Sequence, residues 1–206
     1  MNFRGFVAAC LSGLLFVCAS AGAQQQAPDA LIEQVSKEVL ETARNDPAIQ
    51  AGDLQRITTL VDEKILPHVN FRRMTASAVG RYWRQATPEQ RQRLEAEFKQ
   101  LLMRTYAGAL AQVRNQQVHM KPFRAAPEDK EVIVRTEVRG QGEPVQVDYR
   151  LEKTERGWKI YDVNVLGVWL VENYRSSFAQ EIGQVGIDGL IQKLVERNKN
   201  ASSGQS

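Results

Sequence analysis

The chain has 206 residues, of which 43% are hydrophobic and 25% are charged, and its formal net charge is +3. These values are typical of one large folded domain or two small ones. They argue against disorder over most of the chain and against a dedicated nucleic-acid binder, which would carry a stronger basic excess. Only two cysteines and two histidines are present, so structural zinc, iron–sulfur clusters and a disulfide framework have almost no residues to build on.

Residues 1–23 have the three-part pattern of a cleaved secretory signal. A positive start at Arg4 precedes an apolar stretch over 6–17, and small residues end the segment at Ala23. The stretch is shorter than the roughly 20 apolar residues that span a bilayer. A lipid anchor on either cysteine fits the flanking residues less well than cleavage does. We therefore expect cleavage after Ala23, a mature chain without cysteine and a location in the bacterial periplasm.

Apolar residues at helical spacing predict helices through the first part of the mature chain. The first opens at Pro28 and closes near Asn45, the second begins at Leu54 and ends before Pro67, and a short third follows Asn70.

The fourth predicted helix has the strongest start signal. Thr87 supplies an N-cap hydroxyl, Pro88 occupies the first helical position, and Gln90 completes a capping box. An apolar stripe behind this cap predicts a long helix that ends near Asn115.

The apolar period then changes from 3.6 to 2, which predicts strands. They are expected at 118–123, 132–138, 145–152 and 158–165, and the short turns between them indicate an antiparallel meander.

The last of these strands breaks the alternation. Trp158 and Ile160 fall on one face but Tyr161, Val163 and Val165 on the other, so the strand is either covered on both faces or bulged.

Two further helical stretches, 168–182 and 188–198, follow, and residues 201–206 are expected to be an unstructured tail. Helices, then strands, then helices predict an α+β fold, in a single domain over 24–200.

Catalytic motifs are absent from the sequence. It contains no G-x-S-x-G elbow, P-loop or H-E-x-x-H motif, and nothing links His68 to His119. Asp148 and Tyr149 are strand neighbours whose side chains point to opposite faces, so they do not easily share a site. The residues alone predict an exported α+β domain with no evident catalytic constellation.

Positive charge is concentrated between residues 70 and 93, where six arginines accompany one acid, Glu89. The arginine fork donates two hydrogen bonds at once to phosphate or carboxylate, so the segment predicts a surface that docks on an anionic partner or membrane. A solvated helix surface is the alternative. The candidate docking residues are Arg72, Arg73, Arg81 and Arg84.

Several motifs resemble those of a known family. They are a Gly-Arg-Tyr-Trp turn, the ATPEQ cap and a Leu-x-x-Thr-Tyr helix end within 70–110, then Trp-Lys-Ile-Tyr-Asp-Val, Asn-Tyr-Arg-x-x-Phe and Ile-Asp-Gly-Leu within 157–194. Together they resemble the MlaC family of periplasmic phospholipid-binding proteins, also called toluene-tolerance auxiliary proteins. The resemblance covers essentially the whole mature chain. Trp169 departs from it, because a small polar residue is expected after Gly-Val.

The resemblance implies a curved four-stranded antiparallel sheet surrounded by helices, similar to nuclear-transport-factor-like folds and enclosing an apolar lipid cavity. Such a protein is not an enzyme and uses no cofactor; a phospholipid is its cargo. It would act as a monomer and shuttle lipid between an outer-membrane lipoprotein complex of the MlaA type and an inner-membrane ABC transporter with an MlaD-type MCE subunit. This shuttle maintains outer-membrane lipid asymmetry.

The inward sheet face and the long helix are the expected cavity lining. Periodicity alone does not separate a lined pocket from a filled core, so the choice of sheet face is a hypothesis. The candidate lipid-binding residues are Leu101, Leu102, Tyr106, Val132, Val134, Val147, Tyr149, Leu151, Trp158 and Ile160.

Two other functions stay open. One is an exported enzyme on a similar cone-shaped fold, using acid and tyrosine residues such as Asp148, Tyr149, Tyr161 or Asp162. The other is a periplasmic adaptor or chaperone with a filled core and no ligand.

Overall fold

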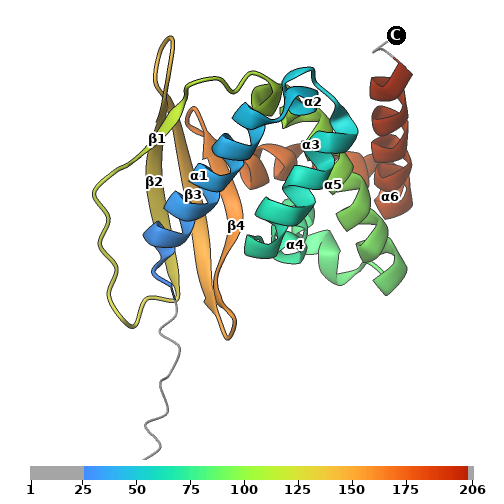
Figure 1. Cartoon of the computed structure of the whole chain (residues 1–206). Coiled ribbons are helices and arrows are strands. Elements are labelled where there is room, and N and C mark those ends of the chain that lie inside the picture. The colour runs from blue at the N-terminus through green and yellow to red at the C-terminus, as the bar shows by residue number, and fades with distance from the viewer. Residues whose placement is uncertain (1–25, 204–206) are drawn as a thin grey trace, which may run out of the picture.

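The computed structural model describes residues 26–203; the predicted signal over 1–23 and residues 204–206 of the predicted tail lie outside this range. Helices come first in the chain, strands follow, and a long helix ends it, which is the segregation typical of an α+β fold (Figure 1). The helical elements before the sheet are α1 (Pro28–Asn45), α2 (Pro47–Gln50), α3 (Leu54–Leu60), the π-helix η1 (Val61–Ile65), the 3-10 helix η2 (Leu66–His68), α4 (Phe71–Val79), the 3-10 helix η3 (Gly80–Arg84) and α5 (Pro88–Ala111). The remaining elements are β1 (Gln117–Met120), β2 (Glu131–Arg139), β3 (Val145–Thr154), β4 (Gly157–Val165), β5 (Val168–Trp169) and α6 (Leu170–Ser203).

The sheet has five antiparallel strands in chain order, one more than expected. The additional strand is the two-residue β5, where the sequence pattern predicted the start of a helix. Leu166 and Gly167 both have positive φ, at 53° and 87°, and this tight turn reverses the chain so that Val168 pairs with Val165. The final helix therefore begins at Leu170.

A β-bulge explains the broken alternation in β4. Leu151 pairs with Ile160 but Arg150 pairs with Asp162, so Tyr161 is an extra residue in the ladder. Residues directly opposite each other in a ladder share a face, and the extra residue shifts the alternation by one. Val163 consequently lies on the same face as Ile160, which decides between the two alternatives in favour of a bulge.

The two sheet faces differ in character. The inner face carries the apolar residues of β2, β3 and β4, where Val134 pairs with Tyr149 and Leu151 pairs with Ile160. The outer face carries polar residues such as Arg135 and Asp148.

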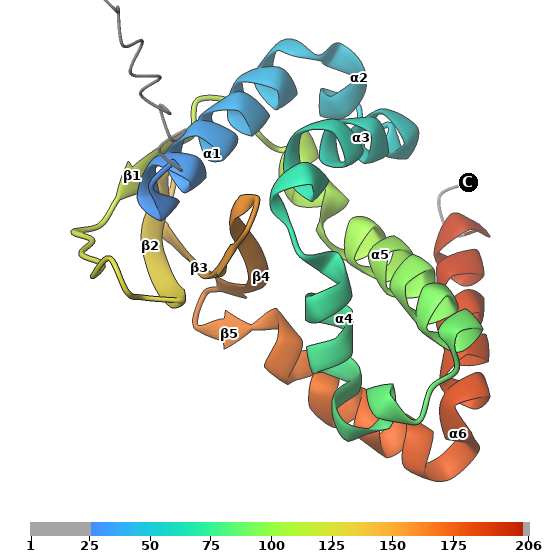
Figure 2. The ribbon, with the colours of Figure 1, turned by 90° about the horizontal axis from the view of Figure 1, so that it is seen from below.

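The helices form two groups around two buried clusters. Figures 1 and 2 show α1 alongside the sheet, with α4, α5 and α6 grouped to one side of it. Apolar residues of α1 and α3 pack with the inner sheet face in a first cluster. A second cluster joins α4, α5 and α6, and in it the Phe98 ring lies 5.3 Å from the Phe178 ring in an edge-on arrangement.

Helix α5 has the predicted start. The Thr87 hydroxyl accepts a hydrogen bond from the Gln90 backbone N–H, and the Gln90 side chain accepts one from the Thr87 N–H, which confirms the capping box. The helix ends at Ala111, about one turn before the expected end.

Helix α6 is interrupted where the sequence pattern had separated two helical stretches. Gly186 has φ 73°, a left-handed conformation that glycine adopts without steric cost. Beyond this kink the helix runs through Ser203, so residues 201–203 belong to its last turn instead of an unstructured tail.

Candidate functional site

A cavity of about 540 Å³ lies between the two clusters, a size typical of ligand sites. Its wall takes residues from both sides: Ile57 and Met103 belong to the first cluster, and Met74 belongs to the second. Apolar side chains form almost all of it. The lining residues are Leu40, Ile57, Val61, Ile65, Leu66, Val69, Phe71, Met74, Lys99, Leu102, Met103, Tyr106, Ala107, Ala109, Leu110, Gln112, Val113, Gln116, Val138, Val145, Val147, Val163, Val165 and Leu170.

Helix α5 forms the long side of the cavity. Its lining residues extend from Lys99 to Leu110, which corresponds to about 17 Å along the axis at the α-helical rise. Across the cavity stands one end of the inner sheet face, where Val138 pairs with Val145 and Val147 pairs with Val165. The space is therefore elongated and apolar, and its shape suits a chain-like hydrophobic ligand.

The π-helix η1 supplies a third part of the wall. Val61 and Ile65 line the cavity, while Asp62 between them reaches Lys99 of α5. Short π-helical turns within helices are rare and are found frequently at functional sites.

Of the predicted lining residues, three lie on the cavity wall: Leu102, Tyr106 and Val147. Leu101 is half-buried against the second cluster. The other six share the inner face with Val147 but lie toward the opposite end of the strands, where they pack in or against the first cluster with α1; they are Val132, Val134, Tyr149, Leu151, Trp158 and Ile160.

The candidate residues did not include the part of the wall before α4 or the part at the end of β4, beyond the bulge. Ile57, Val61 and Ile65 lie at helical spacing within the second predicted helix but are not among the candidate lipid-binding residues. Val163 and Val165 were expected to oppose Trp158, and the bulge returns them to its face. The helical spacing of the first three residues could have identified them from the sequence. The inward position of Val163 and Val165 could not be predicted without knowing of the bulge.

The acids of the enzyme alternative do not meet in the cavity. Asp148 and Asp162 lie on the outer sheet face. The Asp162 carboxylate pairs with Arg150 at 3.0 Å and accepts the Val171 backbone N–H at 3.0 Å, which fixes the start of α6. Burial raises the pKa of Asp162. These contacts give Asp162 a structural role.

The two tyrosines of the same alternative are also separated by the sheet. Tyr149 lies on the inner face, where burial raises its pKa. Tyr161 is at the bulge and donates its hydroxyl to Glu131 at 3.0 Å.

The four predicted docking arginines divide into two kinds. Arg73 is engaged within the molecule: it pairs with Glu131 and Glu152, both at 2.5 Å, and its guanidinium lies 3.6 Å from the Tyr161 ring centre. These contacts tie α4 to β2, β3 and β4.

The other three arginines are exposed. Arg72 approaches Glu95 at 3.9 Å and lies over the Trp83 ring. Arg81 contacts Tyr82, and Arg84 ends η3. Among residues 26–203, neither Arg81 nor Arg84 forms an ion pair with an acid.

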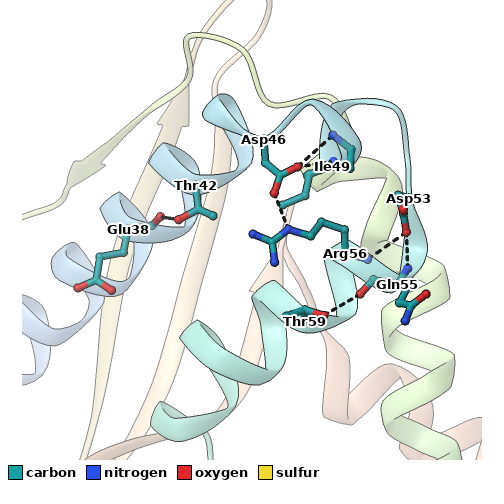
Figure 3. A network of polar contacts seen from close by, with 9 residues as sticks. Glu38, Thr42, Asp46, Ile49, Asp53, Gln55, Arg56 and Thr59 are labelled. Carbon is teal, nitrogen blue, oxygen red and sulfur yellow. Dashed lines mark hydrogen bonds and ion pairs between the residues drawn. The ribbon is translucent and has the colours of Figure 1, made fainter.

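A second hollow, of about 430 Å³, is polar. Figure 3 shows the network around it: Asp46 accepts the backbone N–H groups of Ala48 and Ile49 and pairs with Arg56 at 2.5 Å. The hydrogen bond from Arg56 lowers the pKa of Asp46. Asp53 caps α3 in the same way. The network joins α1, α2 and α3, so we assign it to the fold.

None of the helices described in the structure combines the length and apolar character needed to cross a bilayer.

Several known proteins are similar to this chain in sequence or structure. The solved structure of a phospholipid-binding protein from Ralstonia solanacearum, in complex with a phospholipid, superposes with a TM-score of 0.82 at 50% sequence identity; the match covers 84% of this chain and 98% of that one. The intermembrane phospholipid transport system binding protein MlaC of Haemophilus influenzae is 23% identical over 174 residues, or 82% of this chain and 81% of the relative. The toluene tolerance protein ttg2D of Pseudomonas putida is 36% identical over 109 residues, about half of each chain. The family model described as MlaC protein matches residues 33–196, and the chain therefore belongs to the MlaC family.

Proposed function

We propose that this chain carries a glycerophospholipid as cargo, with the acyl chains in the cavity and the head group outside. The observation that carries the proposal is the apolar wall formed by α5, η1 and the inner sheet face. Two acyl chains contain on the order of 30 methylenes, and each one exposed to water costs about 0.8 kcal/mol. A carrier therefore needs an enclosed apolar space, and chemically uniform tails need no specific polar partners.

The relatives support this cargo and extend it to a pathway. One is described as the binding protein of an intermembrane phospholipid transport system, and another was solved with a phospholipid bound. We infer that the chain is a non-enzymatic periplasmic shuttle, exported by the signal over 1–23. Its partners would be an outer-membrane lipoprotein complex of the MlaA type and an inner-membrane transporter with an MlaD-type subunit, and the lipid needs no cofactor.

Native mass spectrometry of the purified protein, together with lipid extraction, tests the cargo. One phospholipid per chain is expected. The variant V147R places a long cation on the cavity wall, and we expect it to fold but to lose the lipid, because burying an uncompensated charge beside acyl chains is costly.

The matched control is I133R. Ile133 is 36% exposed on β2 and does not line the cavity, so the same charge there should leave lipid occupancy unchanged. Wild-type protein without lipid would contradict the proposed function, and normal occupancy in V147R would contradict the assignment of this wall.

A further inference from the structure

The cavity wall includes a charged residue. Of the lining residues that the structure describes, Lys99 is the only charged one, and all but a few of the others are apolar. Its Nζ lies 3.1 Å from Asp62 Oδ1 and 3.4 Å from Oδ2. Lys99 thus belongs both to the wall and to an ion pair that joins α5 to η1.

This ion pair is accessible to solvent. The Lys99 side chain is 30% exposed and the Asp62 side chain 42%. Lys99 is the first residue of α5 on the wall, and its side chain also reaches water, so it stands where the apolar wall ends. A ligand with long apolar tails and an anionic group next to them would bring its anion to this position.

We propose that Lys99 binds the phosphate of the bound phospholipid. The phosphate either replaces Asp62 as the partner of the Lys99 ammonium or binds beside it. The inference rests on the proposed function. A lysine ammonium has three donors on a flexible stem, so it can hold a carboxylate and a phosphate oxygen together or move between them. Asp62 competes with the lipid phosphate for the same cation.

The two members of the pair therefore have opposite expected effects. Removing the cation in K99Q takes away a phosphate partner. Removing the anion in D62N leaves Lys99 free for phosphate and also removes a nearby negative charge. A purely structural ion pair predicts otherwise, because losing either partner would then weaken binding in the same direction.

The test compares two lipids that differ only in the phosphate-bearing head group. Protein stripped of lipid is incubated with vesicles of dioleoyl-phosphatidylglycerol that contain dioleoylglycerol, and bound species are quantified by native mass spectrometry. For a partly exposed pair, we expect K99Q to lower the ratio of bound phosphatidylglycerol to diacylglycerol about fivefold. D62N should raise the ratio, and K99R should preserve it.

The control is K64Q. Lys64 lies in η1, as Asp62 does, and pairs with Glu38 at 3.3 Å with similar exposure, but it lines the polar hollow and not the apolar cavity, so the ratio should not change. Circular dichroism and thermal melting establish that each variant folds.

The outcomes separate the two proposals. Wild-type protein that takes up neither lipid contradicts the proposed function. Uptake by the wild type with an unchanged ratio in K99Q, or ratios that fall in both K99Q and D62N, contradicts the role of Lys99 alone. Binding of inorganic phosphate to lipid-free protein, lost in K99Q, would identify a general anion site instead of a lipid phosphate site.

Discussion

Glu137 on β2 pairs with two cations, one on its own strand and one just after β1. Arg139 Nε is 2.6 Å from its carboxylate, and Lys121, one residue beyond β1, pairs with the second oxygen. Hydrogen bonds from Arg139 and Lys121 lower the pKa of Glu137 to about 2. Because the folded-state pKa lies below the unfolded value, the ionised group stabilises the fold above about pH 4.5, and this contribution is lost as the pH falls toward 2.

The variant E137Q should therefore be less stable than wild type near neutral pH, and the difference should shrink as the pH falls from about 4.5 toward 2. Urea unfolding at a series of pH values measures it. E143Q, in the exposed turn between β2 and β3, controls for the loss of one negative charge. A difference for E137Q that is independent of pH across this window would contradict the assigned contacts.

At the scale of elements, α4 and η3 present a basic surface that separates into anchored and free arginines. Arg73 is held by two glutamates and a tyrosine ring, so its replacement would disturb the packing of α4 on the sheet. Arg81 and Arg84 are exposed on η3, and they test docking on an anionic partner without that complication. We expect R81E/R84E to weaken binding to an MlaA-type or MlaD-type partner complex about tenfold at low salt, and less at high salt.

Surface plasmon resonance at several salt concentrations measures this effect. The double variant R124E/R156E reverses two exposed arginines elsewhere on the chain and serves as the control. Equal weakening in both double variants would indicate a response to net charge alone, and unchanged binding in R81E/R84E would rule out docking through η3.

Sequence patterns predict the elements well where local chemistry specifies them. The capping box of Thr87 and Gln90 fixes the start of α5, and period-two alternation locates β2 and β3. The bulge at Tyr161 left two alternatives open, because an extra residue is visible only once the partner strand is known. The two-residue β5 depends on the turn at Leu166, a residue that rarely adopts positive φ, so nothing local predicted it.

The cavity was the part that the residues did not specify. Val134 and Val147 lie on the same sheet face with the same alternation, yet Val134 is fully buried in the first cluster and Val147 lines the cavity. The difference depends on where α1 lies across the sheet, a tertiary fact. A pattern of apolar residues predicts which face is inside, and only the helix arrangement determines whether that inside is filled.

At the scale of the whole molecule, bound lipid should raise stability by linkage. A ligand that binds only the folded state adds about 2.7 kcal/mol to the free energy of unfolding at a free concentration 100 times its Kd. We expect delipidated protein to melt at a lower temperature than protein as purified, and reloading with phosphatidylglycerol vesicles to restore the higher value.

V147R gives the internal control for this measurement, because vesicles should not raise its melting temperature. Melting that is identical with and without lipid in the wild type would contradict binding within the core.

The position of the cavity between the two buried clusters has a consequence for cooperativity. With lipid in place, Met74 on one side and Met103 on the other touch a common hydrophobic body, and the two clusters should unfold as one unit. Without lipid they share fewer apolar contacts, and the calorimetric transition should broaden or split. The acyl chains would thus be a part of the hydrophobic core that can leave it, and release of the lipid would also lower the cooperativity of the fold.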